Sequence, residues 1–350
     1  MKIRTLLVDS SYLLERSYHG AKDVYTNSFG HCGGLYSFLT TVRKLIKDHK
    51  INKVVLVWDG ENSGVDRHKL DPAYKANRKN KTWYEKIEMS EYEINKEKEK
   101  RRSILKQKKR IQAYGQELFL RHIEVDEIEG DDLIAAYCVA YDKKEEIYIY
   151  TNDRDFGQLL DLNITILFAD IELPVNKTNY FFKFGHHYSN AIIMKIIGGD
   201  VSDNIKGIKG IKEDILIKYF PDMKYKHMTV REICRKADDI NKERVVNKQK
   251  PLKIFENLLG NIDRLILNHK LVNLRKPFLN KDAEEALLEL EAPLDPKDRG
   301  VNNLHKMMME DEFLTIYNGT FPNYVEPFYT VITNEQDLLK EYYKNNRGNL

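Results

Sequence analysis

Nine acidic side chains could do chemistry together, since seven stand just after short β-rich runs or at the start of a helical stretch and two lie in the GDVSDN segment. They are Asp9, Asp59, Glu129, Asp131, Asp132, Asp153, Asp155, Asp200 and Asp203. In an open parallel α/β sheet, the carboxyl ends of the strands and the helix starts that follow them lie along one edge, where ligands bind. We therefore expect these carboxylates to converge on one pocket.

So many carboxylates cannot lie together without compensation, because like charges a few Å apart raise each other's pKa steeply. No Cys or His cluster accompanies them, and oxygen ligands of this kind select Mg²⁺ or Mn²⁺ over zinc. Two such ions can activate a water and stabilise charge on a phosphate and its leaving oxygen. The predicted chemistry is hydrolysis of a phosphate ester with two Mg²⁺ ions, for which Mn²⁺ could substitute.

Each acidic group has a plainer explanation when it is taken alone. A strand-terminal aspartate such as Asp9 or Asp59 is a common turn residue, and GDD at 130–132 could be an N-cap with favourable helix-dipole charges. The order D, D, ExDD, DxD and GDxxD along one chain is much harder to explain by turns and caps. We therefore favour the metal site.

Alternating strands and helices are predicted to position these residues. The runs at 3–9, 53–59, 145–153 and 164–170 are β-rich and end in aspartate. The stretch at 33–49 has apolar residues at helical spacing, which predicts a crossover helix, and a further helix begins near Asp131. The predicted fold class is α/β, with a mostly parallel central sheet flanked by helices.

The segment from 67 to 110 is long, basic and poor in apolar periodicity, so we expect it to project from the core. Its first part mixes cations with aromatic rings, and single-stranded nucleic acid is held by cations on phosphates and rings against bases. The expected contacts are Arg67, Lys69, Tyr74, Lys79 and Lys81. The alternative is a solvated helix face or a flexible tail.

A helix, a glycine-containing turn and a second helix are predicted from about 192 to 220. The glycines of the turn, GIKGI, would let the backbone approach a phosphate, and the lysines would add charge without reading bases. The expected contacts are Gly207, Lys209, Gly210 and Lys212. The alternative is an ordinary helical hairpin with exposed lysines. Further helices follow to residue 350, without a catalytic motif.

The bulk composition sets limits on the compartment and on the partners. The 350 residues include 57 basic and 54 acidic side chains, a net charge of +3, so any preference for nucleic acid must come from uneven placement. Three cysteines form no CxxC and cannot all pair, which indicates a reducing compartment, by default the cytoplasm. No segment approaches the length of a membrane span or a signal peptide, so we expect a soluble protein.

Together these motifs resemble the 5′ nuclease superfamily, which includes flap endonucleases, the 5′-nuclease domains of bacterial DNA polymerases, and bacteriophage 5′-to-3′ exonucleases. The resemblance runs from residue 3 to about 220. It rests on LLVDSSYLLERSYH, VWDG, EVDEIEGDDLIA, TNDRDFGQLL and GGDVSDNIKGIKGI. SGVDRHKLDPAYKANRKNKTWYE is especially similar to the phage ribonuclease H branch.

The resemblance implies roles for particular residues. The acids that would ligate the metals are Asp9, Asp59, Glu129, Asp131, Asp153 and Asp155, and those that would complete the cluster directly or through water are Asp132, Asp200 and Asp203. YKANR is similar to the end of a helical arch, where Lys75 and Arg78 would contact the scissile phosphate. The family's hairpin often binds K⁺, but Lys212 and Glu213 depart from its pattern, which weakens that expectation.

The resemblance also implies an organisation and a function. We expect a PIN-like catalytic domain at 1–190, with an arch at about 67–110, and a helical domain at 191–350 that contains a helix-hairpin-helix motif. The expected function is hydrolysis of DNA, and of RNA in RNA/DNA hybrids, at 5′ ends or flap junctions during primer and flap removal in replication. The expected protein is a monomer in the cytoplasm, the host's if the chain is phage-encoded. A replication clamp or a single-strand-binding protein is a candidate partner.

Three alternatives remain from other functional classes. One is a PIN-type metal-dependent ribonuclease that acts on single-stranded RNA, and another is a DNA-binding protein without catalysis. The third, a haloacid-dehalogenase-like phosphatase, is disfavoured because its first strand requires DxD, and Ser11 stands at the second acidic position.

Overall fold

The computed structural model describes residues 2–79, 90–297 and 299–346, without the side chains at 78, 79, 345 and 346. The chain forms two compact units. The first comprises Met1–Ser63, Ile87–Asn152 and Leu279–Leu350, and the second comprises Gly64–Lys86 and Asp153–Phe278. The predicted domains at 1–190 and 191–350 do not coincide with these units, because the chain returns to the first unit at Leu279.

A parallel sheet forms the centre of the first unit. Its strands in this unit are β1 (Arg4–Asp9), β4 (Lys53–Asp59), β5 (Arg121–Val125) and β6 (Glu146–Thr151). They lie in the order β5-β4-β1-β6, and each pairing between them is parallel. β4 is buried at every position except Asp59, as expected for a parallel strand with both faces covered. The three strands predicted in this unit are confirmed, and β5 is an addition.

Helices follow the strands of the first unit. They include α1 (Ser10–Gly20), α2 (Gly33–His49), α6 (Glu91–Glu117) and α7 (Gly130–Tyr141). The helices α1, α2 and α6 pack against one another, and α7 packs against β1 and β4. The predicted crossover helix at 33–49 and the helix that begins near Asp131 are confirmed.

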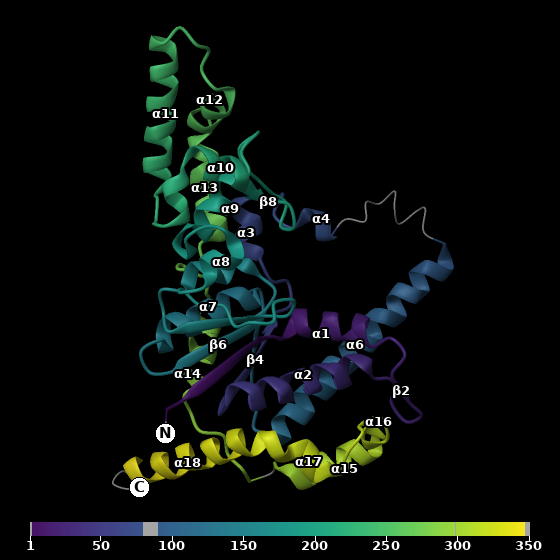
Figure 1. Cartoon of the computed structure of the whole chain (residues 1–350). Coiled ribbons are helices and arrows are strands. Elements are labelled where there is room, and N and C mark those ends of the chain that lie inside the picture. The colour runs from purple at the N-terminus through teal and green to yellow at the C-terminus, as the bar shows by residue number, and fades with distance from the viewer. Residues whose placement is uncertain (1, 80–89, 298, 347–350) are drawn as a thin grey trace. The chain divides into compact units, whose positions relative to one another are not determined.

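Helix α6 begins at a capping box formed by Ser90 and Glu93, and its buried side chains lie only in its C-terminal part. Its N-terminal part extends beyond the rest of the first unit (Figure 1). This extension agrees with the projection that the basic sequence predicted.

The last part of the chain is helical and belongs to the first unit. Its helices are α14 (Lys281–Glu289), α15 (Val301–Glu310), α16 (Phe313–Ile316), α17 (Phe321–Val325) and α18 (Tyr329–Asn346). A buried ion pair joins α18 to the sheet, since Arg121 Nε of β5 donates to Glu335 Oε1 at 2.9 Å. The Arg121 guanidinium also donates to the carbonyls of Leu290 and Ala292, at 2.8 Å each. The C-terminal helices are therefore fixed to this strand.

The second unit is mainly helical. Its elements include α3 (Val65–Leu70), α4 (Ala76–Lys79), η1 (Arg154–Leu159), β7 (Ile164–Phe168), α8 (Tyr180–Phe184), α9 (Ala191–Gly198), β8 (Gly199–Asp200), β9 (Ile205–Lys206), α10 (Glu213–Tyr219), α11 (Val230–Val246), α12 (Lys253–Leu259) and α13 (Ile262–Val272). The apolar faces of α9 to α13 share one core, and Figure 1 shows these helices grouped together. The strand predicted at 164–170 is confirmed as β7.

The described residues contain no disulfide and no helix that is long and apolar enough to cross a membrane.

Candidate active site

Asp9 is the last residue of β1 and caps helix α1. Its Oδ1 accepts a hydrogen bond from the backbone N–H of Tyr12 at 3.1 Å, and its Oδ2 accepts one from the Thr151 hydroxyl at 3.0 Å. Thr151 ends β6, the parallel neighbour of β1, so both residues stand at the carboxyl edge of the sheet. The Asp9 carboxylate is therefore fixed at the predicted edge.

Asp59 ends β4, the other parallel neighbour of β1. Its backbone N–H donates to the Ser11 hydroxyl at 3.0 Å, and its Oδ1 accepts from the backbone N–H of Gly130 at 2.7 Å. A Cβ at position 130 would lie 3.2 Å from that oxygen, so glycine leaves room for the contact. Asp59 is thereby joined to the start of α7.

The start of α7 supplies three more acids. Glu129 is the N-cap residue, and Asp131 and Asp132 lie in the first turn, where negative charge is favourable. Glu129 is 4% exposed and Asp132 1% exposed, a degree of burial that is rare for carboxylates unless they have partners. The first unit therefore brings five of the nine predicted acids to the ends of neighbouring strands and to one helix start.

In the second unit, three acids surround Lys195 of α9. The Lys195 Nζ lies 2.6 Å from Asp155 Oδ1 and also pairs with Asp200 Oδ2. Asp153 caps η1, and its Oδ1 accepts from the backbone N–H of Asp155 at 2.8 Å. The Asp200 Oδ1 accepts from the N–H and the hydroxyl of Ser202, at 2.8 and 2.6 Å. The carboxylates of Asp153 and Asp200 are therefore held by the residues around them, and Asp155 is linked to Asp153 through its backbone N–H.

The acids of the second unit are electrostatically crowded. Burial and the neighbouring Asp153 raise the pKa of Asp155 well above its usual range. Burial opposes the charge on Lys195, but Asp155, Asp153 and Asp200 raise the pKa of this ammonium. Burial also opposes the charge on Asp200, yet Lys195 lowers the pKa of Asp200 to about 2. Three carboxylates thus lie close to the Lys195 ammonium and raise its pKa together.

The loop that contains Lys75 is attached to the GDxxD segment. The backbone N–H of Lys75 donates to the carbonyl of Asp203 at 2.8 Å, and the Asn204 side chain donates to the Ala73 carbonyl at 2.7 Å. Lys75 has a left-handed backbone with φ of 49°, and its Nζ lies 5.1 Å from the centre of the Tyr74 ring. The structure therefore places the backbone of Lys75 next to that of Asp203.

Two residues that the sequence suggested as nucleic-acid contacts are buried. Arg67 is 4% exposed, its Nε donates to the Leu271 carbonyl at 2.9 Å, and its guanidinium lies over the Phe278 ring. Tyr74 is 3% exposed and belongs to the core of the second unit. The structure gives both residues a packing role, which corrects the predicted surface contact. Lys69 is exposed and pairs with Asp66 at 2.7 Å.

Part of the predicted basic segment lies outside the described residues. This holds for Lys81 and for the side chains of Arg78 and Lys79. Their predicted contacts stay predictions.

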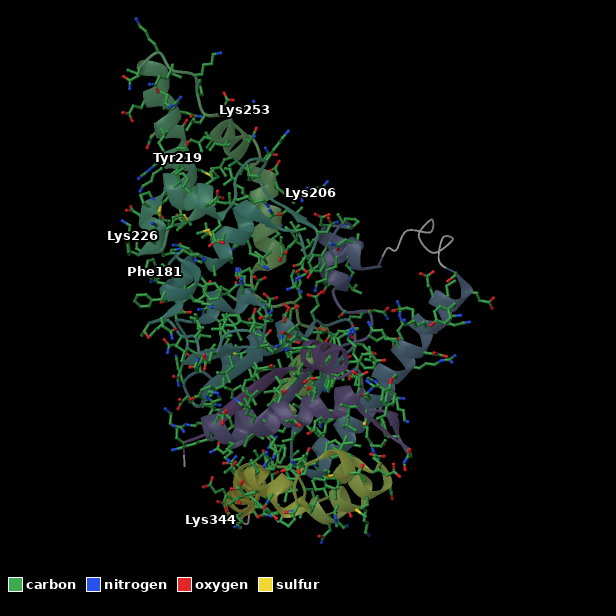
Figure 2. The ribbon with its side chains drawn as sticks, turned by 45° about the vertical axis from the view of Figure 1, so that its right-hand side comes forward. Phe181, Lys206, Tyr219, Lys226, Lys253 and Lys344 are labelled. Atoms are coloured by element: carbon green, nitrogen blue, oxygen red, sulfur yellow. The ribbon has the colours of Figure 1, made fainter. Side chains whose placement is uncertain are left out.

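The glycine-containing turn joins α9 to α10 through the two-residue antiparallel strands β8 and β9. Gly207 packs so closely on Gly198 that a Cβ would lie 2.2 Å from its backbone, and Gly210 has a φ of +85°. Lys209 and Lys212 are exposed, and so is Lys206 at the surface of this unit (Figure 2). Glycine at 207 is therefore required by internal packing, while the lysines remain available to a phosphate backbone. A helix-hairpin-helix motif that binds DNA stays a prediction.

Comparisons with known proteins agree with these motifs. The family model for the 5′-3′ exonuclease N-terminal resolvase-like domain matches residues 4–185. The 5′-3′ exonuclease of Mycoplasmopsis pulmonis (strain UAB CTIP) is 30% identical over 304 residues, which are 81% of this chain and 94% of that protein. The chain belongs to the 5′-3′ exonuclease family. It is a 5′ nuclease, as the order of its acidic motifs predicted.

Other relatives extend the comparison of this 5′ nuclease. The 5′-3′ exonuclease of Buchnera aphidicola subsp. Schizaphis graminum (strain Sg) is 25% identical over 238 residues, which are 65% of this chain and 74% of that protein. A solved structure of T5 5′-exonuclease is similar with a TM-score of 0.60 and 19% identity, and covers 89% of this chain and 99% of its own. This structural likeness confirms the predicted fold class.

Lys195 of this 5′ nuclease pairs with two of the predicted acids, but the sequence motifs did not predict it at the site. It is the one charged residue of α9, whose sequence is AIIMKIIG. A cation in an otherwise apolar helix must find a partner when the helix is buried. That signal was present, but the sequence did not show which acids would supply the partner.

No group of three or more His, Cys, Asp or Glu side chains in the described parts of this 5′ nuclease has the arrangement of a metal site.

Proposed function

We propose that the protein uses divalent metal ions, Mg²⁺ or Mn²⁺, to hydrolyse phosphodiester bonds of DNA at 5′ ends and flap junctions. The observation that supports this most directly is the crowding of carboxylates around Lys195, whose Nζ pairs with Asp155 and Asp200 while the Asp153 carboxylate is bonded to the backbone of Asp155. A divalent cation would offset the repulsion between carboxylates that lie this close together. Hard carboxylate oxygens without thiolate or imidazole are the donors that Mg²⁺ and Mn²⁺ prefer. The residues therefore fit the ions.

Solved structures of similar proteins also support metal and DNA binding. One similar structure is described as T5 5′-exonuclease with bound divalent metal ions, zinc in that case. Another is described as a bacteriophage T5 flap endonuclease in complex with DNA and metal ions, with a TM-score of 0.60 and 17% identity. We propose that this chain likewise binds metal ions and DNA.

Each unit would hold metal through its own carboxylates. In the first unit these are Asp9, Asp59, Glu129, Asp131 and Asp132, and in the second they are Asp153, Asp155, Asp200 and Asp203. The bound ions would supply a polarised water and stabilise charge on the scissile phosphate. The hydrogen bonds to Asp9, Asp59 and Asp200 fix the carboxylates before any ion arrives, so little reorganisation is required when it binds.

Basic residues would position the nucleic acid. We propose that Lys75, attached by its backbone to Asp203, neutralises the scissile phosphate together with Arg78. The exposed Lys209 and Lys212 would contact the duplex backbone without reading its sequence. Lys212 Nζ also lies 3.4 Å from the Gly198 carbonyl, so this lysine contacts the turn to which the resemblance assigns a K⁺ ion.

The resemblance to the family also suggests a wider setting. We propose that the protein removes flaps and RNA primers during replication, acts as a monomer in the cytoplasm, and cuts RNA within RNA/DNA hybrids. A clamp or a single-strand-binding protein would recruit it.

A panel of 5′-labelled substrates tests the proposal. A DNA flap, a nicked duplex, an RNA/DNA hybrid and single-stranded RNA are incubated with the protein in Mg²⁺ and in EDTA. We expect cleavage near the junction or 5′ end of the first three in Mg²⁺ alone, and little cleavage of single-stranded RNA. Robust cleavage of that RNA would favour the PIN-type ribonuclease. Binding of the flap without cleavage in Mg²⁺ or Mn²⁺ would favour a non-catalytic DNA-binding protein.

A further inference from the structure

Lys195 pairs with two of the acids that would hold metal under the proposed function. Its Nζ pairs with Asp155 at 2.6 Å and also with Asp200, and its side chain is only 23% exposed. Asp155 and Asp200 come from different elements, one from η1 and the other from β8. The ammonium therefore joins two segments of the second unit that are distant in the sequence.

This ion pair supplies positive charge at the place where the proposed function requires a metal. The exposed fractions of the Asp155 and Asp200 side chains are 15% and 10%, so water screens their repulsion only weakly. Without a cation between them, the two carboxylates and Asp153 would repel one another in this poorly solvated place. Lys195 relieves that repulsion in the protein without metal.

The same geometry makes Lys195 a competitor of the metal. Mg²⁺ binds carboxylate oxygens at about 2.0–2.1 Å, and a divalent ion and an ammonium on the same oxygens repel each other strongly at such distances. Asp155 Oδ1 and Asp200 Oδ2 cannot therefore serve both cations fully. The lysine has a flexible four-carbon stem, so it can move without unfolding α9.

We propose that Lys195 is an internal counterion that holds Asp155 and Asp200 together in the metal-free protein and withdraws from them when a divalent ion binds. This inference rests on the proposed metal role of Asp155 and Asp200. It makes Lys195 a positioning residue that stabilises the empty site and weakens metal affinity. Metal binding is then weaker, because it must break the two ion pairs of Lys195.

The test measures metal binding and stability in the whole protein, without substrate. Mn²⁺ binding is followed by the loss of the free-ion electron paramagnetic resonance signal, and thermal unfolding is followed in EDTA and in Mg²⁺. The variant Lys195→Met keeps the stem and removes the charge. We expect it to bind Mn²⁺ at least about tenfold more tightly. We also expect a lower Tm in EDTA and a larger rise of Tm on addition of Mg²⁺ than in the wild type.

Two variants serve as controls. Lys195→Arg keeps the positive charge, so its Mn²⁺ affinity should stay within about threefold of the wild type. Lys236→Met removes a lysine that pairs with Asp222 at 3.1 Å elsewhere in the same unit. It should leave the Mn²⁺ affinity unchanged, which shows that net charge alone is not responsible. If Lys195→Met folds only in Mg²⁺, that result supports the proposal, and Lys195→Gln then provides the affinity comparison.

Asp155→Asn separates failure of this inference from failure of the proposed function. If Asp155→Asn and the wild type bind the same amount of Mn²⁺ with the same affinity, the proposed metal role of Asp155 is wrong. If Asp155→Asn loses an ion but Lys195→Met binds Mn²⁺ no more tightly than the wild type, the metal role stands. In that case the counterion role of Lys195 is overturned.

Discussion

His122 of β5 should make the protein less stable in mild acid. Both of its ring nitrogens are buried and have no hydrogen-bond partner within the described residues. Burial, together with the positive charge of Arg299, lowers the pKa of His122 to about 4. The unfolded chain takes up this proton at about pH 6.5. The stability due to neutral His122 is therefore fully present above pH 6.5 and is lost as the pH falls toward 4.

The magnitude follows from these two pKa values. Between pH 8 and pH 5, His122 takes up nearly one proton in the unfolded state and almost none in the folded state. This difference lowers the free energy of unfolding by about 2 kcal/mol. His122→Leu and His122→Asn remove this group with an apolar and a polar side chain. The two variants can differ from the wild type in their free energy of unfolding at pH 8. Between pH 8 and pH 5, however, the free energy of unfolding of each should fall by about 2 kcal/mol less than that of the wild type.

Urea denaturation of the three proteins at pH 8, 6.5 and 5 provides the measurement. The difference between wild type and variant isolates the proton of His122, because the other titrating groups are common to all three proteins. If this difference stays constant within about 0.5 kcal/mol, the ring nitrogens find water or a partner and the reasoning is refuted.

Three further predictions concern single side chains. Glu335→Gln leaves the buried Arg121 charge without its partner and should lower the unfolding free energy by about 3–5 kcal/mol in urea denaturation, whereas a loss under 1 kcal/mol would contradict the burial of this pair. Arg67→Ala should lower the free energy of unfolding by about 1–3 kcal/mol, because it leaves a buried carbonyl of α13 without its donor. Its affinity for a flap should stay within about threefold of the wild type. A large loss of affinity at unchanged stability would instead support a nucleic-acid contact by Arg67. Lys75→Ala should slow single-turnover flap cleavage far more than it weakens flap binding, and equal losses in both would argue against a catalytic role.

The sequence predicted the strands that end in the acidic residues because local patterns determine them. β1, β4 and β6 are apolar runs followed by Asp9, Asp59 and Asp153, and burial on both faces of a parallel sheet requires such runs. Helix α2 was predictable for a similar reason, since its apolar residues recur at helical spacing. The convergence of the first-unit acids then follows from parallel topology.

The sequence did not predict features that depend on charges buried by distant partners. β5 was missed because Arg121 and Glu124 break its apolar pattern, and the acid that makes Arg121 tolerable, Glu335, lies 214 residues away. Arg67 was assigned to the surface for the same reason, since its carbonyl partner lies 204 residues further along the chain. The partners of Lys195 could not be predicted from the sequence either, because they lie on elements that only the fold brings together. A buried cation is visible in the sequence only as an exception, and its partner must be found in the structure.

The proposal of metal-assisted hydrolysis is tested most directly by cleavage of a 5′-labelled DNA flap under single-turnover conditions. Wild type and Asp155→Asn are compared in Mg²⁺, with wild type in EDTA as a reference. We expect the wild type to cut near the junction in Mg²⁺ only, and Asp155→Asn to be slower by on the order of a hundredfold or more, about 3 kcal/mol of barrier. Cleavage by the wild type in EDTA, or by Asp155→Asn at the wild-type rate, would contradict the central claim.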